Sequence, residues 1–323
     1  MPNIISLGSA TKDIFIDAKE LKKGSGFCFP LGGKIEMKEI QTFSGGGGVN
    51  TAVTFALLGL ETGFCGVIGQ DLAGQEILEQ LNQLEIDTSM VKTRQNKQTD
   101  TGIIFHAESE RTILLFHEVS RTLNEKDINW KELKNTAWLY VAPLWGKAAA
   151  LTLKLCDFAR QNRIKIVLNP SLDQLKLKSI WEVIGKTEVL LLNDDEASFL
   201  TDVKPYDEKA VFSSICSCAK PGFAQKVVIT KGKNGATCFD GKFLYQVSAP
   251  PVKVIDATGA GDSFGSGFVA GLIRFKNTEK ALKLAMANAI SNIQVFGANQ
   301  GLLKKNDELP EIKIIKSKIK FQF

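Results

Sequence analysis

The chain has 323 residues, 44% hydrophobic and 23% charged, a composition typical of a globular protein with one large domain and a smaller appendage. Its formal net charge of +5, from 40 basic and 35 acidic residues without a long basic run, does not decide between a nucleic-acid binder and a protein that binds anionic nucleotides. We expect no nucleic-acid partner. Only two histidines are present, and the six cysteines form no CxxC pair. The small number of histidines excludes chemistry that needs several of them. The cysteine spacing disfavours a zinc-ribbon site and predicts reduced thiols.

The sequence also predicts no targeting or membrane segment. The N-terminal residues lack a basic, apolar and small-residue signal pattern, and no apolar run has membrane-spanning length. We therefore expect a cytoplasmic protein without a membrane partner.

The first predicted element is a short strand at residues 3–8 that ends in glycine, and a polar stretch follows it. Ligands of open α/β sheets bind beyond the carboxyl ends of the strands, so Asp13 is placed to face a small molecule. An ordinary turn aspartate is the alternative interpretation.

Residues 14–43 show no helical periodicity and contain two β-like pieces, 14–17 and 35–38, around a glycine-rich middle. Residues 101–117 predict a hairpin whose turn lies at 108–110. Together these segments indicate a small sheet that is separate from the main one.

Four consecutive glycines, at positions 45–48, come before an apolar helix predicted at residues 51–60. Gly45 and Gly46 allow the backbone to approach a ligand closely, and Asn50 can offer its amide to hydroxyl groups while it starts the helix. A flexible loop capped by Asn50 is the plainer alternative.

Predicted strands then alternate with predicted helices. The helices lie at residues 75–84 and 147–162, and the strands lie at 64–68, 138–141, 164–168, 189–192 and 227–229. Continuous apolar strands are typical of sheets that are covered on both faces. The alternation therefore predicts an α/β fold with a doubly wound, mainly parallel sheet flanked by helices.

The predicted strand at 189–192 is followed by an acidic helix start, in which Asn193 and Glu196 lie on the same side of the helix. Mg²⁺ prefers oxygen ligands and keeps much of its hydration, so this pair can hold the ion through its waters. Acidic helix starts are also frequent without a metal.

Residues 230–235, Thr-Lys-Gly-Lys-Asn-Gly, follow the next buried strand and precede a predicted hairpin at 236–244. Read alone, this segment is a β-turn with two solvated lysines.

Residues 256–262, Asp-Ala-Thr-Gly-Ala-Gly-Asp, predict a loop that becomes a helix at about Gly261. The small residues Gly259, Ala260 and Gly261 let backbone N–H groups converge, and the free donors of the first helical turn point the same way. This predicts an anion hole. Asp262 at its rim is placed to take a proton from a hydroxyl that attacks a bound phosphate. An acid that only complements the helix dipole is the alternative.

Two stretches resemble the signatures of the ribokinase-like (PfkB) carbohydrate kinases. Residues 256–262 are similar to the second signature, D-T/A-x-G-A-G-D, and residues 44–52 resemble the first, G-G-x-x-x-N. They stand roughly 200 residues apart in the family's order, and the likeness covers roughly residues 3–302.

The resemblance implies an ATP-dependent transfer of the γ-phosphoryl group to a hydroxyl of a sugar or sugar-like molecule, with Asp262 as base. It also implies that Gly259, Ala260 and Gly261 stabilise the transition state and that the small sheet is a lid over the sugar. The substrate would be bound by residues of the N-terminal part: Asp13, Gly45, Gly46 and Asn50.

For the nucleotide, the resemblance implies contacts from residues spread over the second half of the chain: Asn193, Thr230, Gly232, Gly235, Asn288 and Gly297. The N-x-x-E pattern implies Mg²⁺ at Asn193 and Glu196, through water. Family members commonly bind K⁺ through carbonyls at positions that match Asp256 and Thr258.

The expected domain boundaries follow the same scheme. Residues 1–13, 44–100 and 119–310 form the large α/β domain, residues 14–43 and 101–118 form the lid, and residues 311–323 are a tail that forms an edge strand or stays loose. A lid strand that pairs with another copy would give a homodimer.

Three other functions compete with this interpretation. A Rossmann dehydrogenase would use G-x-G-x-x-A at residues 265–270, but these glycines fall inside the predicted helix and no acidic residue occurs at 280–306. A catalytically silent sugar or nucleotide sensor would have the same fold. A nucleoside kinase is the third, because Trp145 or Phe29 could stack on a base.

The acceptor itself stays open. Ribokinases usually show Asn-x-Asp where this chain has Thr-Lys-Asp at residues 11–13, and an acidic residue where 141–145 stand. Both departures put ribose in doubt.

Overall fold

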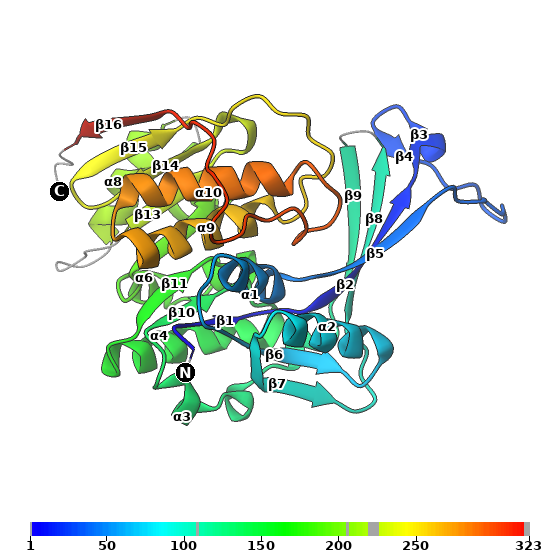
Figure 1. Ribbon diagram of the computed structural model, residues 1–323, viewed down its shortest axis with the longest axis horizontal. Helices are drawn as coiled ribbons and strands as arrows, with labels where there is room; N and C mark the ends of the chain where they lie inside the picture. The colour runs from blue at the N-terminus through cyan, green and yellow to red at the C-terminus, as the bar shows by residue number, and fades with distance from the viewer. Residues whose placement is uncertain (1, 108–109, 205–206, 219–225, 320–323) are drawn as a thin grey trace.

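The computed structural model describes residues 2–107, 110–204, 207–218 and 226–319. Figure 1 shows a large body built on one sheet, and a small sheet that projects from its side. The central sheet has ten strands, in the order β16 (Ile314–Lys318), β15 (Phe243–Val247), β14 (Ala236–Phe239), β13 (Lys226–Thr230), β12 (Val189–Asn193), β11 (Lys165–Leu168), β10 (Trp138–Val141), β1 (Ile4–Leu7), β6 (Thr62–Gly69) and β7 (Asp87–Arg94).

The seven strands from β13 to β7 pair in parallel, and β14, β15 and β16 pair antiparallel at one edge. The predicted mainly parallel sheet is therefore confirmed. The hairpin expected at residues 236–244 is formed by β14 and β15, and the C-terminal tail supplies the edge strand β16.

Helices cover both faces of this sheet (Figure 1), as the doubly wound fold predicts. On one face, the core contains residues of α4 (Leu151–Gln161), α6 (Ile180–Ile184), α7 (Asp194–Thr201) and α8 (Glu208–Cys218). On the other face, the core contains residues of α1 (Gly47–Leu57), α2 (Leu72–Gln83), α9 (Ala260–Phe275) and α10 (Thr278–Asn292). The short helices are α3 (Trp130–Leu133), α5 (Leu172–Leu175), η1 (Lys19–Leu21), η2 (Ser120–Thr122), η3 (Glu125–Asp127), η4 (Gly146–Ala150) and η5 (Gly232–Asn234).

Helices α9 and α10 pack closely because α9 carries glycines on the contact side. A Cβ on Gly271 would lie 2.5 Å from the Ala281 Cα atom. Gly265 and Gly267 of the G-x-G-x-x-A stretch lie within α9, as predicted, so this stretch does not form a dinucleotide-binding turn.

The separate small sheet predicted from residues 14–43 and 101–117 is confirmed, and we call it the lid. Its strand order is β5 (Ile40–Gly45), β2 (Thr11–Asp17), β8 (Asp100–Ala107) and β9 (Glu110–Phe116). Strands β8 and β9 form the expected hairpin, whose predicted turn at residues 108–109 lies outside the described residues. A further pair, β3 (Lys22–Lys23) and β4 (Gly26–Phe27), lies at the outer end of the lid (Figure 1).

Several predicted boundaries are wrong. The strand expected at residues 35–38 is absent from the described structure. The pairing of β2 with β5 ends at Ile16 and Ile40, and β2 itself ends at Asp17, so residues 35–38 have no strand to pair with. Asp13 lies inside β2 and not in a turn after β1. The helix expected at 147–162 begins as the 3₁₀ segment η4 and becomes α-helical only at Leu151.

Asn50 is not a helix cap. Gly46 takes the N-cap position of α1, with φ +91°, and Asn50 lies within the helix. Its side chain is therefore free to bond elsewhere. Among the described helices, none is long and apolar enough to cross a membrane.

Candidate functional site

Two cavities lie along the carboxyl ends of the central strands, where ligands of open α/β sheets bind. The lid cavity, of about 180 Å³, is lined by Ser9, Thr11, Asp13, Gly46, Gly47, Asn50, Ile104, Ile113, Leu115, His117, Pro143, Trp145, Thr258, Gly259, Asp262 and Ala298. The helix cavity, of about 620 Å³, is lined by Thr230, Gly232, Lys233, Asn234, Gly235, Ala249, Pro250, Pro251, Val252, Val254, Ala257, Ala260, Gly261, Phe264, Met286, Ala289, Ile290 and Ile293.

The first turn of α9 lies between the two cavities. Gly259 and Asp262 line the lid cavity, whereas Ala260 and Gly261 line the helix cavity. One helical turn thus reaches both cavities, and Asp262 itself lines the lid cavity.

Asp262 is held by an amide relay from α1. Asn50 Nδ2 donates to Asp262 Oδ2 at 2.8 Å, and Asn50 Oδ1 accepts from Asn299 Nδ2 at 3.1 Å. No hydrogen-bond donor to Asp262 Oδ1 is found in the described parts of the chain. Burial raises the pKa of Asp262, and the hydrogen bond from Asn50 opposes that rise. This leaves one carboxylate oxygen with raised basicity facing a cavity.

The relay extends to the lid. Asn299 Nδ2 also donates to the carbonyl oxygen of Ser44, at 3.0 Å, at the end of β5. The loop after α10, the base of the lid and the carboxylate of Asp262 are therefore linked by hydrogen bonds.

Asp13 is buried in the lid cavity, where it accepts a hydrogen bond from Thr11 Oγ1 at 2.9 Å. Burial raises its pKa to about 6, the Thr11 hydrogen bond opposes the rise, and the negative charges of Asp256 and Asp262 add to it. Gly45 makes room for this carboxylate, because a Cβ at Gly45 would lie 2.0 Å from Asp13 Oδ2. The sequence therefore places a glycine where a larger residue would displace the acid.

The segment predicted to form an anion hole is the N-terminus of α9. Gly259 is the N-cap of α9, with φ +79°, and a Cβ there would lie 2.3 Å from the Ala298 carbonyl oxygen, so only glycine fits. The Ala260 N–H donates to the Ala257 carbonyl at 3.3 Å. Within the described chain no partner is found for the N–H groups of Gly259, Gly261 and Asp262, which leaves these three as free donors.

Thr230, Gly232 and Gly235 all line the helix cavity, as expected for the loop after β13. The two lysines of this loop differ in position. Lys233 lines the cavity, whereas Lys231 Nζ donates to Glu208 Oε1 at 2.5 Å and to Thr237 Oγ1 at 2.8 Å. Only Lys233 is therefore placed to meet a ligand's negative charge.

Asn288 and Gly297 line neither cavity. The fully buried Asn288 side chain donates to the Ser263 carbonyl and accepts from the Leu303 N–H, both at 2.9 Å. The prediction of a direct ligand contact by the Asn288 side chain is thus not supported, because both of its polar ends bond within the protein. The helix instead lines its cavity with an apolar stripe: Met286, Ala289, Ile290 and Ile293.

Asp256 joins two loops. Its Oδ1 accepts from the N–H and the hydroxyl of Thr258, at 2.9 and 2.6 Å, and its Oδ2 accepts from the Gly297 N–H at 3.1 Å. The main-chain carbonyls of Asp256 and Thr258 receive no hydrogen bond from described residues. Two unpaired carbonyls fit the oxygen ligands of a K⁺ ion.

Asn193 and Glu196 cap α7 reciprocally. Asn193 Oδ1 accepts from the Glu196 N–H at 2.8 Å, and Glu196 Oε2 accepts from the Asn193 N–H at 2.9 Å. Burial first, and the charges of Asp195 and Asp262 next, raise the pKa of Glu196 against the hydrogen bond from Asn193. A cation near Glu196 and Asp262 would relieve this repulsion. The described residues contain no cluster of three His, Cys, Asp or Glu side chains for direct metal binding, so the oxygens present fit Mg²⁺ held largely through water and phosphate.

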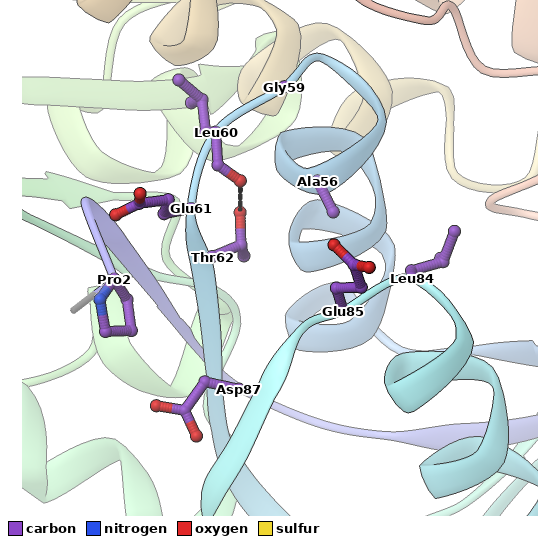
Figure 2. Close-up of a pocket in the computed structure, with 9 residues that line it drawn as sticks. All are labelled: Pro2, Ala56, Gly59, Leu60, Glu61, Thr62, Leu84, Glu85 and Asp87. Carbon is purple, nitrogen blue, oxygen red and sulfur yellow. Dashed lines mark hydrogen bonds between the residues drawn. The ribbon is translucent and has the colours of Figure 1, made fainter.

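Figure 2 shows a third cavity, of about 470 Å³, at the amino ends of β6 and β7. Its carboxylates belong to Glu61, Glu85 and Asp87, and its Thr62 hydroxyl donates to the Leu60 carbonyl at 2.9 Å. It lies at the opposite end of the strands from Asp262, and we assign no function to it.

Sequence reasoning also missed His117 and Asn299. His117 directly follows β9 and lines the lid cavity, and Asn299 lies in the loop after α10. Neither belongs to a signature, and only folding brings them to the site.

Comparison with known proteins identifies the family of this chain. The family model described as "pfkB family carbohydrate kinase" matches residues 1–305. A ribokinase of Bacillus subtilis (strain 168) is 26% identical over 308 residues, which cover 95% of this chain and 98% of that protein. A cytidine kinase of Thermococcus kodakarensis is 26% identical over 262 residues, which cover 79% of this chain and 90% of that protein.

The fold is also that of a solved ribokinase. The structure of Arabidopsis thaliana ribokinase complexed with ribose and ATP matches with a TM-score of 0.77 and 23% identity, over 94% of this chain and 96% of that one. The chain belongs to the pfkB family of carbohydrate kinases, and it is a phosphotransferase with a ribokinase-like fold that acts on an alcohol group of a sugar or nucleoside.

Proposed function

We propose that the protein transfers the γ-phosphoryl group of ATP to a hydroxyl of a sugar or nucleoside, with Asp262 as the general base. The observation that carries this proposal is the position of the first turn of α9, which reaches both cavities. The acceptor occupies the lid cavity and the nucleotide occupies the helix cavity, with adenine against the apolar stripe of α10 and the phosphates toward Gly261.

In this reaction the acceptor hydroxyl gives its proton to Asp262 Oδ1 as its oxygen attacks the γ-phosphorus. The bond from phosphorus to the bridging oxygen breaks, and ADP leaves. Asn50 keeps the carboxylate oriented through its bond to Oδ2, and the N–H groups of Gly261 and Asp262 bind oxygens of the phosphoryl group. Asp13 accepts hydrogen bonds from acceptor hydroxyls.

Mg²⁺ would neutralise phosphate charge, held by Asn193 and Glu196 through water, and K⁺ would bind the carbonyls of Asp256 and Thr258. Lys233 adds a positive charge at the mouth of the helix cavity. Asn288 and Gly297 act by holding α9 and the Asp256 loop in place.

The test is Asp262→Asn, which keeps the shape of the side chain but removes the base. Loss of a general base typically lowers kcat by ~10²- to 10⁴-fold. ADP release is measured with a panel of sugars and nucleosides, and ATP binding is measured separately to show that the variant is folded. A variant with kcat within a few-fold of the parent would contradict the assignment of the base.

A nucleoside is the second candidate acceptor, because Trp145 lines the lid cavity and its ring can stack on a base. The same panel separates the two. A silent sensor would bind a member of the panel and release no ADP with any of them.

We also propose a homodimer formed through the lid. Strand β9 is at the edge of the lid sheet, and its Leu114 and Phe116 side chains are exposed. An exposed apolar edge strand is a surface on which a second copy can pair. Size-exclusion chromatography with light scattering tests this, and a monomer mass at micromolar concentration would contradict it.

A further inference from the structure

His117 lines the lid cavity, and the proposed reaction does not use it. His117 Nδ1 lies 2.9 Å from Asp100 Oδ2. The His117 ring stacks on Trp145, with centroids 5.2 Å apart and planes at 22°. Both rings line the cavity, and the His117 side chain is only 10% exposed. The imidazole is thus fixed on one edge and one face.

Asp100 determines which ring nitrogen carries a hydrogen. Asp100 is fully buried, and it accepts from the N–H groups of Glu118 and Ser120, at 2.9 and 3.2 Å, and from the Ser120 hydroxyl. Although burial favours the protonated form, the hydrogen bonds from His117 and Ser120 lower its pKa. An ionised carboxylate only accepts hydrogen bonds, so His117 Nδ1 is the donor. With the hydrogen on Nδ1, the imidazole tautomer has Nε2 as its acceptor.

The second nitrogen has no partner inside the protein. Among the residues that the structure describes, no hydrogen bond to His117 Nε2 is found. Because His117 lines the lid cavity, a hydroxyl of a ligand bound there can donate to this nitrogen.

The charges of the cavity restrict the ligand. Its lining has the carboxylates of Asp13 and Asp262, and none of its described lining residues is a lysine or arginine. A phosphate monoester would bring ≈ −1.5 to −2 charges beside these two acids. The cavity therefore favours an acceptor without a phosphate.

We propose that His117 sets acceptor specificity: its Nε2 accepts a hydrogen bond from a second hydroxyl of an uncharged acceptor, which packs against Trp145 in the lid cavity. This inference rests on the proposed function, because the acceptor is placed in the cavity that contains Asp262. It adds a recognition residue that belongs to neither signature.

Two variants separate recognition from a structural role. His117→Asn places an amide nitrogen near the position of Nδ1 and keeps the bond to Asp100, but it has no atom at the Nε2 position. His117→Gln places an amide near the Nε2 position and gives up the bond to Asp100. The probes are D-ribose, cytidine and D-ribose 5-phosphate. The readouts are ADP release and the change in Trp145 fluorescence on acceptor binding without ATP, with Trp145→Phe as the control for the signal.

With the better of the two uncharged probes, His117→Asn should raise the acceptor KM by about 5- to 100-fold, the loss expected when a buried donor is left unpaired. The KM for ATP and the melting temperature should stay unchanged, and His117→Gln should recover part of the loss. An acceptor KM within twofold of the parent in His117→Asn, or tighter binding of D-ribose 5-phosphate than of both uncharged probes, would overturn the proposal.

The outcomes also separate the two proposals. ADP release that is insensitive to His117→Asn overturns the recognition role and leaves the kinase assignment standing. A saturable fluorescence change that depends on His117, without ADP release, supports the recognition site and contradicts the kinase assignment. No binding and no turnover with any probe contradicts both.

Discussion

Replacing Asp13 by asparagine should stabilise the empty protein at neutral pH while it weakens acceptor binding. Burial raises the pKa of Asp13 from 3.8 to about 6. The folded protein therefore binds this proton more tightly than the unfolded chain does. Stability from this group is complete below the unfolded pKa and is lost as the pH rises through the folded pKa.

The size of the change in unfolding free energy follows from the shift in the pKa of Asp13. A rise from 3.8 to about 6 corresponds to roughly 3 kcal/mol of unfolding free energy at high pH, of which about 1.5 kcal/mol develops between pH 5 and pH 8. Asp13→Asn has no titrating group at this position. The difference in unfolding free energy between Asp13→Asn and the parent should therefore grow by about 1.5 kcal/mol over this range.

Urea unfolding at pH 5, 6, 7 and 8 measures this difference. Glu36→Gln is the matched control. It also removes one negative charge, but the Glu36 side chain is exposed, so burial does not act on its carboxylate. Asp13→Asn should in addition raise the acceptor KM at pH 8, and the parent's kcat/KM for the acceptor should fall as the pH drops below about 6. A stability difference that is flat from pH 5 to pH 8 would refute the role of burial at Asp13.

Three further outcomes are expected. Gly45→Ala places a Cβ 2.0 Å from the Asp13 carboxylate, so the acceptor KM should rise at least tenfold while the ATP KM stays constant; equal acceptor KM values would contradict the geometry. Lys233→Met should raise the ATP KM, because Lys233 lines the helix cavity. Lys231→Met should lower the melting temperature and leave the ATP KM unchanged, because Lys231 bonds to Glu208. The reverse pattern would contradict the positions of the two side chains. Asn299→Ala removes the hydrogen bond to the Asn50 amide, which in turn binds Asp262. The kcat measured by ADP release should therefore fall by about two- to tenfold. An unchanged kcat would show that Asn299 and Asn50 do not orient Asp262.

The fold class followed from the sequence because its signal is local. Apolar runs such as 138–141 and 189–192 are buried as strands on both faces, and the segments between them form helices. The small sheet was also predicted, because two β-like stretches within residues 101–117 are separated by polar residues, which indicates a hairpin.

Boundaries that depend on a distant partner were not predicted. Residues 35–38 have a strand-like composition, but no strand lies beside them. Gly46 caps α1 in place of Asn50 because its φ of +91° is available to glycine at little cost.

The sequence by itself predicted a helix start that carries an acid at residues 259–262, because small residues mark the turn and the first N–H groups of a helix have no partner within it. Only the tertiary structure decided which other groups reach that turn. The relay from Asn299 through Asn50, the fixed His117 ring and the internal bonds of Asn288 and Lys231 all join residues that lie far apart in the chain. A side chain's direction depends on the packing of its element against others, and no local pattern records that packing.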